Sequence, residues 1–130
     1  MAGPIVYVGS HTIQPGKVDL AHAASADLAS HLEAIHPGYL YFQITISEDG
    51  GRMTVLQVHF DEESMELHLK LAGDKIAAAY EFLAGTMAID IFGDPSAELA
   101  KSIGGMAGSA PVTIHRPDYG FSRLARSIST

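Results

Sequence analysis

The fold of this chain is decided by residues 36–76, which read HPGYLYFQITISEDGGRMTVLQVHFDEESMELHLKLAGDKI. Apolar side chains recur at every second position over 40–46, and a second alternation runs over 54–60. This period of two is typical of β-strands. The Asp-Gly-Gly sequence at 49–51 is a tight-turn signal between them. Over 65–80 the apolar spacing changes to three or four residues, which predicts a helix packed on the hairpin.

The same periodicities extend the pattern in both directions. They predict strands over 5–13, 86–92 and 112–116, and helices over 17–35, 62–82 and 96–106. The order β-α-β-β-α-β over the first 93 residues is that of an α+β, ferredoxin-like fold with an antiparallel sheet and both helices on one face. We therefore expect one domain over 1–116, with a core at 4–93, an added helix and strand at 94–116, and a polar tail at 117–130.

Composition restricts the class of protein. An apolar content of 47% and a charged content of 18% indicate a single globular domain of 130 residues. The net charge of -7 disfavours a nucleic-acid partner. Cysteine is absent, which excludes disulfides and thiolate chemistry. Without a signal-peptide pattern or an apolar run of about 20 residues, the expectation is a soluble cytoplasmic protein that does not enter the membrane.

The sheet face opposite the helices is expected to be partly apolar. From the alternation we assign to it Tyr39, Tyr41, Gln43, Val55, Gln57 and His59. A face of this kind lines a cavity or packs on a second subunit, and a symmetric homodimer is the expected assembly. The helix over 62–82 carries two apolar stripes, so the added segment or a partner should cover its outer side.

Four segments resemble the antibiotic-biosynthesis-monooxygenase type of dimeric α/β barrel. They are IQPGK (13–17), HPGYLYFQI (36–44), DGGRMTVLQVHFDEES (49–64) and ESMELHLKLAGDKI (63–76). The resemblance places His68 at a position where the family has His or Trp. It implies a homodimer whose two sheets close into a barrel, with a cavity between each sheet and its helices. Some members oxidise quinols or polyketide phenols with oxygen and no cofactor, and others cleave haem.

The chain departs from this family pattern. It has no Trp and no Asn, and Ala78 stands where a haem-degrading member would have its axial His. We therefore expect no haem and no other cofactor. The predicted function is cofactor-independent, monooxygenase-like chemistry on a small aromatic or quinol compound. The alternative is a non-catalytic, small-molecule-binding or structural dimer of the same fold.

Seven histidines, at 11, 22, 31, 36, 59, 68 and 115, raise the question of a metal site. None of them is paired at helical ligand spacing or as HxH on a strand, so no metal site is expected. His22, His31 and His36 are expected to be solvated.

The candidate site residues come from the strands and the second helix. We expect His59 to act as a base and His68 as a polar contact. The expected ligand-binding residues are Tyr7, Tyr39, Tyr41, Gln43 and Gln57. The structural alternative makes His59 an interface histidine and the tyrosines interface packing.

Overall fold

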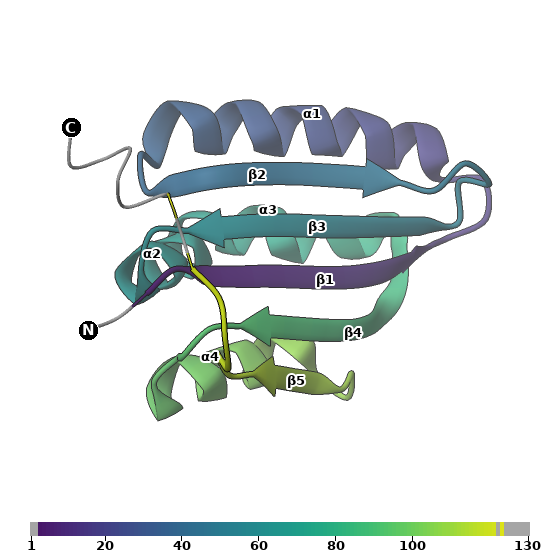
Figure 1. Ribbon diagram of the computed structural model, residues 1–130. Coiled ribbons are helices and arrows are strands. Elements are labelled where there is room, and N and C mark those ends of the chain that lie inside the picture. The colour runs from purple at the N-terminus through teal and green to yellow at the C-terminus, as the bar shows by residue number, and fades with distance from the viewer. Residues whose placement is uncertain (1–2, 122, 124–130) are drawn as a thin grey trace.

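A computed structural model describes residues 3–121 and 123 of the chain. The elements in order are β1 (Ile5–Ile13), α1 (Val18–Ile35), β2 (Tyr39–Ile46), β3 (Arg52–His59), α2 (Glu62–Leu71), α3 (Gly73–Ala78), a 3-10 turn η1 (Ala79–Glu81), β4 (Leu83–Phe92), α4 (Ala97–Ala107) and β5 (Val112–His115). Figure 1 shows the strands side by side, with the helices behind them.

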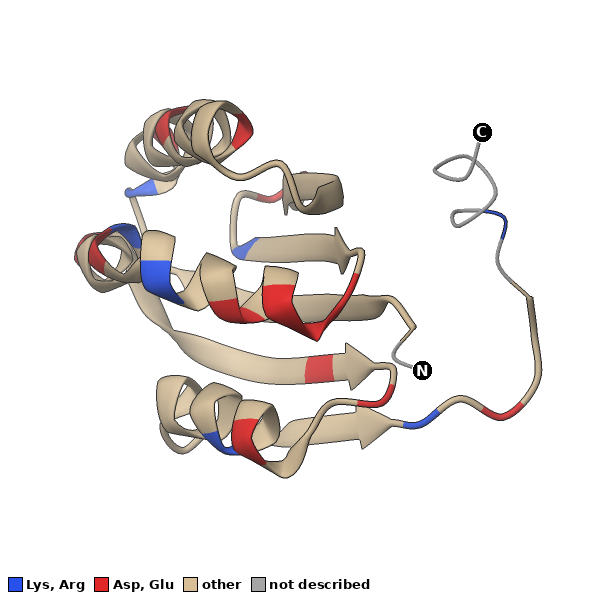
Figure 2. Ribbon diagram, turned by 90° about the vertical axis from the view of Figure 1, so that its left-hand side faces the viewer, with Lys and Arg blue, Asp and Glu red and all other residues tan. Residues whose placement is uncertain are grey.

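The sheet has the strand order β2-β3-β1-β4-β5. Its first four strands are antiparallel and have the predicted ferredoxin-like connection. β5 joins the β4 edge in parallel, so the complete sheet is mixed. Within the described residues the helices lie on one face of the sheet, as predicted for the helices over 17–35 and 62–82 (Figure 2). The fold class is thus confirmed for one chain, whose sheet stays open; closure into a barrel with a second copy stays a prediction.

The assignment of β3 and Tyr39 to the open face is wrong. Strand pairing puts Gln57 beside Tyr7, and His59 beside both Ile5 and Tyr39. All of these side chains point toward the helices, and Gln57 and His59 are completely buried. Val55, which pairs with Gly9, lies on the same helix-facing side.

Two physical reasons explain the wrong assignment. β3 carries apolar residues on both of its faces, so alternation alone does not say which face is buried. In β2, a register shift between Tyr39 and Tyr41 puts Tyr39 on the same side as Phe42. A β-bulge of this kind moves one side chain to the opposite face.

The helix predicted over 62–82 is divided into α2, α3 and η1. Its first turn is stabilised by Asp61, which accepts a hydrogen bond from Ser64 N at 2.9 Å. The break is at Ala72, directly before Gly73, whose low helix propensity favours an interruption. As a result Phe82 and Leu83 belong to the turn and the start of β4, and both are buried against α1 and β1.

The core consists of two clusters on the helix side of the sheet. One lies under α2 and α4 and includes Met65, Ile89, Ile91, Leu99 and Ile103. The other lies under α1 and η1 and includes Ile13, Ala21, Met53 and Phe82. The added α4 therefore shares the main core and borders one flank of α2, while Leu67 on the outer side of α2 stays exposed.

Candidate functional site

A cavity of about 240 Å³ lies between the sheet and helices α1, α2 and α3. Its walls are largely apolar: Leu28, Phe42, Ile44, Met53, Val55 and Ile76. The charged side chains that line it are on the helical side, where Lys75 of α3 forms an ion pair with Asp27 of α1. Because both of these side chains are solvent-accessible, the cavity opens between α1 and α3.

Uncharged polar groups line the cavity at two places along β1. Tyr7, Gln57 and His68 form the first group, and His11 with Thr86 forms the second. His11 Nδ1 lies 3.1 Å from Thr86 Oγ1. Tyr7 and His11 are four residues apart on one strand, a separation of about 13 Å at 3.3 Å per residue. A ligand in the cavity can therefore contact polar groups at both ends.

The first polar group belongs to a buried chain of hydrogen bonds. His59 Nδ1 lies 2.7 Å from Ser64 Oγ, and His59 Nε2 lies 2.7 Å from Gln57 Oε1. Gln57 Nε2 lies 3.2 Å from His68 Nε2. His68 Nδ1 is bonded in turn to the hydroxyl of Tyr39. Five side chains from β2, β3 and α2 are thus linked in series.

The amide of Gln57 decides the direction of every bond in this chain. In the observed orientation its NH₂ donates to His68 Nε2, so the His68 proton is on Nδ1 and is donated to the Tyr39 oxygen. His59 donates from Nε2 to Gln57 and accepts at Nδ1 from the Ser64 hydroxyl. Turning the amide over reverses all of these bonds without losing one. In both directions each imidazole is neutral and fully paired.

Burial keeps these groups uncharged. Desolvation, with a smaller contribution from neighbouring His36, lowers the pKa of His59 to about 4. Desolvation, and then the neighbouring His59 and His36, lower the pKa of His68 to about 3. Burial raises the pKa of Tyr7 and of Tyr39, so both phenols keep their protons. The polar end of the cavity is therefore neutral at pH 7.

His36 supports this chain from the end of α1. Gly38 N donates to His36 Nδ1 at 3.1 Å, so the ring proton is on Nε2 and is donated to the Ser64 carbonyl at 2.9 Å. A Cβ on Gly38 would lie 2.6 Å from Ser64 Oγ and 2.8 Å from His36 Cε1. Only glycine fits there, so the His-Pro-Gly segment fastens the end of α1 to the first turn of α2.

The structure brings together five of the seven predicted site residues. Tyr39, Gln57, His59 and His68 are connected through the hydrogen-bond chain, and Tyr7 pairs with Gln57 across the sheet. Of these, Tyr7, Gln57 and His68 line the cavity. His59 lies behind Gln57, and both of its ring nitrogens are engaged.

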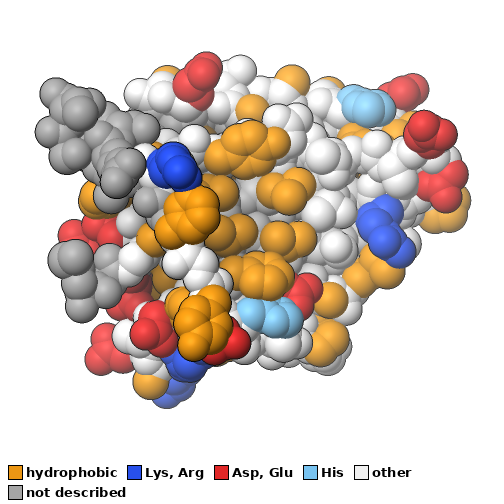
Figure 3. Space-filling view, viewed as in Figure 1, with side chains coloured by type: hydrophobic (Ala, Val, Ile, Leu, Met, Phe, Trp, Pro, Cys, Tyr) orange, Lys and Arg blue, Asp and Glu red, His pale blue; other side chains and the backbone are white. Residues whose placement is uncertain are grey.

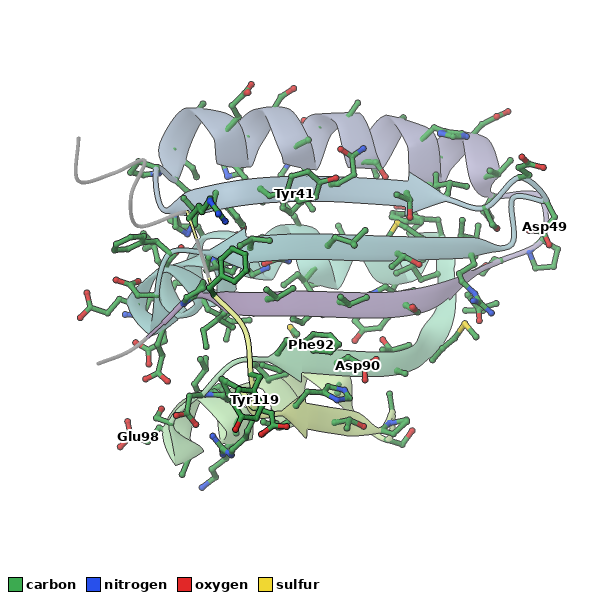
Figure 4. All side chains as sticks on the ribbon, viewed as in Figure 1. Tyr41, Asp49, Asp90, Phe92, Glu98 and Tyr119 are labelled. Atoms are coloured by element: carbon green, nitrogen blue, oxygen red, sulfur yellow. The ribbon has the colours of Figure 1, made fainter. Side chains whose placement is uncertain are left out.

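Tyr41 and Gln43 are not part of this site. They project from the opposite face of the sheet, where Tyr41 is 51% exposed (Figure 4). That face also carries Phe92, whose ring stacks on His115, and His115 Nε2 lies 2.8 Å from Asp90 Oδ1. Figure 3 shows this face, with apolar side chains gathered across its middle.

Sequence reasoning missed His36, Ser64, His11 and Thr86 as parts of the site. The prediction that His36 is solvated is wrong, because its side chain is buried and satisfied by Gly38 and Ser64. The His-Pro-Gly sequence was a usable signal, although it indicates the end of a helix more directly than a buried ring. Ser64, His11 and Thr86 have no local signal in the sequence.

Within residues 3–121 and 123, no group of three or more His, Asp or Glu side chains is arranged to hold a metal ion. In the same part of the chain, none of the helices combines the length and the apolar character needed to cross a bilayer.

No family model matches the chain, and no curated protein sequence matches it. Solved structures do. MupZ from Pseudomonas fluorescens is 20% identical with a TM-score of 0.75, over 95% of this chain and 97% of that one. The match to MupZ covers 95% of this chain, which is more than it would cover if residues 94–116 were left out. The likeness therefore includes α4 and β5.

Other similar structures cover mainly the first four strands and their helices. A Caulobacter crescentus protein provisionally named an antibiotic biosynthesis monooxygenase is 25% identical, with a TM-score of 0.64 over 73% of this chain and 92% of that one. A Chloroflexus aurantiacus protein with the same provisional name is 18% identical, with a TM-score of 0.58 over 72% and 95%. The chain therefore has the α+β fold of structures provisionally named antibiotic biosynthesis monooxygenases.

Proposed function

We propose that this protein binds a small, neutral aromatic or quinol compound in the cavity beneath α1–α3 and oxidises it with oxygen without a cofactor. The observation that carries the proposal is the lining of the cavity: apolar walls, with uncharged hydrogen-bonding groups at both ends. At about 240 Å³ the cavity lies below the roughly 300–1,000 Å³ of pockets that take drug-sized ligands. A compound of one or two rings suits it.

The proposed reaction is balanced without another reductant. A phenol with a free para carbon loses its hydroxyl proton, and the electron-rich phenolate reacts with O₂ at that carbon. Cleavage of the O–O bond leaves one oxygen on the ring as the second quinone carbonyl, and the other leaves as water. For 1-naphthol the products are 1,4-naphthoquinone and water. The substrate supplies all of the electrons.

The roles of the protein groups follow from their positions. Tyr7 and Gln57 face the cavity as donors to a substrate oxygen, and neutral His68 is a polar contact beside them. His59 does not line the cavity, so we assign it a positioning role through its bond to Gln57. With a pKa of about 3, His68 is too weak a base to deprotonate a phenol at pH 7. We therefore expect the phenol to lose its proton to water.

Oxygen uptake tests the proposal. Purified protein with 1-naphthol should consume one O₂ per 1,4-naphthoquinone formed, without added metal or flavin. The rate should rise with pH toward the pKa of the naphthol itself. A Gln57→Leu variant should lose the activity, whereas Gln14→Leu, outside the cavity, should retain it. Absence of uptake with 1-naphthol and with naphthoquinols would reject the oxidase chemistry.

A non-catalytic ligand carrier is the second candidate. The lowered pKa values of His59 and His68 favour it, because they leave the site without a base that is effective at neutral pH. In that case, 1-naphthol should bind stoichiometrically and be recovered unchanged.

We also propose a homodimer formed through the open face of the sheet. Val6, Val8, Leu56 and Val58 are on this face with the exposed rings of Tyr41 and Phe92. An apolar patch across a whole sheet is unusual on a monomer. Tyr41 and Gln43 would then contact the partner subunit rather than the ligand.

A further inference from the structure

Gly9 is an unusual residue for the middle of a central strand. It lies within β1 between Val55 of β3 and Ile89 of β4, and its backbone is buried. Glycine in a strand interior weakens the strand, and it often marks a place where another group approaches the backbone closely. At Gly9 the approaching group is a side chain of the same strand.

That group is Tyr7. Residues two apart on a strand point to the same face, and the ring of Tyr7 extends over Gly9. A Cβ on Gly9 would lie 2.6 Å from Tyr7 Oη and 2.9 Å from its Cε1. No other residue leaves the ring in this position, so the absence of a side chain at Gly9 decides where the phenol lies.

The hydroxyl of Tyr7 is a donor without a protein acceptor. The residue is 96% buried, since its exposed fraction is 4%, and it lines the cavity. Within the described residues no hydrogen bond joins its Oη to another residue. Because none of the buried side-chain N or O atoms in this part of the chain lacks a partner, the Oη must be accessible from the cavity. The hydroxyl of a mostly buried tyrosine normally finds a partner, and this one can find it only in the cavity, where a ligand oxygen can accept its proton.

We propose that Gly9 is a specificity-determining residue: it lets Tyr7 lie along the cavity floor and donate to an oxygen acceptor of a flat, uncharged ligand. This inference rests on the ligand cavity of the proposed function but not on oxidation. The selected class is a largely flat, one- or two-ring compound with a carbonyl or phenolic oxygen at the end that lies beside Tyr7. A carboxylate is disfavoured, because Gln57 and His68, which line the cavity with Tyr7, are uncharged, and the lining cation Lys75 is already paired with Asp27.

A matched pair of probes tests whether Tyr7 donates a hydrogen bond to an oxygen acceptor of the ligand. α-Tetralone and tetralin share one bicyclic skeleton and differ by a single carbonyl. Binding can be followed by the intrinsic fluorescence of the tyrosines, since the chain has no Trp. We expect α-tetralone to bind more tightly than tetralin by roughly three- to tenfold, the ratio expected for one hydrogen bond. Tyr7→Phe should abolish that preference while retaining tetralin affinity.

Two further variants test the role of Gly9. Val55 and Ile89 flank Gly9, so an added methyl group can move the Tyr7 ring only away from the sheet and into the cavity. Gly9→Ala should thus weaken both probes by roughly tenfold or more. The double variant Tyr7→Leu/Gly9→Ala removes the ring and should recover tetralin binding, with no preference for the ketone.

Three results would overturn the inference. They are a retained ketone preference in Tyr7→Phe, unchanged binding in a folded Gly9→Ala, and binding of neither probe by the wild-type protein. Circular dichroism establishes that each variant is folded, and Tyr7→Phe provides the test should Gly9→Ala fail to fold. If α-tetralone binds through Tyr7 but 1-naphthol consumes no oxygen, the specificity assignment stands and the oxidation proposal fails.

Discussion

At the scale of single residues, the site depends on burying imidazoles that have no charge. His59 and His68 are buried on the helix side of the sheet, with ring centroids 5.9 Å apart. Such a pair is stable only while each ring nitrogen has a partner and neither ring is protonated. Stability should therefore respond to hydrogen-bond deletion and to acid.

Removing the Ser64 hydroxyl tests the hydrogen-bond chain. Ser64→Ala leaves His59 Nδ1 buried without its donor, which should lower the free energy of unfolding by about 1–3 kcal/mol. Ser102→Ala is the matched control, because its hydroxyl bonds only to the Glu98 carbonyl on an exposed face of α4. The measurement is urea unfolding at pH 7. Equal losses for the two variants would refute the energetic importance of the chain.

Acid should destabilise the protein through His59 and His68. Their folded-state pKa values are lowered to about 4 and about 3, so between these values and the ordinary 6.5 the unfolded chain binds more protons than the folded one. The contribution of these two histidines to the free energy of unfolding is therefore complete above pH 6.5. It decreases as pH falls below 6.5, by roughly 2 kcal/mol for each histidine at pH 5.

Urea unfolding at pH 7 and pH 5 measures this loss. His68→Gln should show a smaller difference between the two pH values than the wild-type protein. His22→Gln changes an exposed histidine of α1 and should leave the difference unaltered. A wild-type protein equally stable at both pH values would contradict the neutral, buried state of these rings.

At the scale of elements, glycine has a different role at two places. One is the start of α3, after the interruption that follows α2, and the other is the turn between β2 and β3. Gly73 starts α3 with open space where a Cβ would be, whereas Gly50 has a φ of +74° and Val18 Cγ2 3.3 Å from such a Cβ. The first position tolerates a side chain, and the second requires glycine.

The two Gly→Ala variants should therefore have opposite effects. Gly73→Ala should stabilise the protein by about 0.4–1 kcal/mol, since alanine reduces the entropy of the unfolded chain and favours helix. Gly50→Ala should destabilise it by about 1 kcal/mol or more through left-handed strain. Thermal unfolding followed by circular dichroism compares them. Changes of the same sign would show that one of these backbone assignments is wrong.

At the scale of the whole molecule, the one-sided arrangement of helices leaves an apolar sheet face uncovered (Figure 3). If a second copy covers this face, a charge at its centre should separate the two. Leu56→Lys should convert the dimer to a monomer in sedimentation velocity experiments. Leu67→Lys, at the exposed surface of α2, should leave the dimer intact. A monomeric wild-type protein at micromolar concentration would reject the dimer.

The sequence by itself determined the order and type of the elements. Alternation over 5–13, the Asp-Gly turn at 49–51 and the apolar stripe of 17–35 are local signals, and the structure has β1, the β2–β3 hairpin and α1 where they indicate. Local periodicity fixes such elements because each residue's preference depends on its near neighbours. Tyr7, Gln57 and His68 were identifiable as candidates because they are polar groups within apolar strands and helices.

Only the tertiary structure decided which face each candidate occupies. The register shift at Tyr39 and the apolar residues on both faces of β3 made alternation ambiguous. Burial of Gln57 and His59 became favourable only because Ser64, His68 and Tyr39 arrive from other elements to satisfy them. Likewise, the cavity and the space that Gly9 provides for Tyr7 arise from the packing of helices on the sheet, which no local pattern in the sequence specifies.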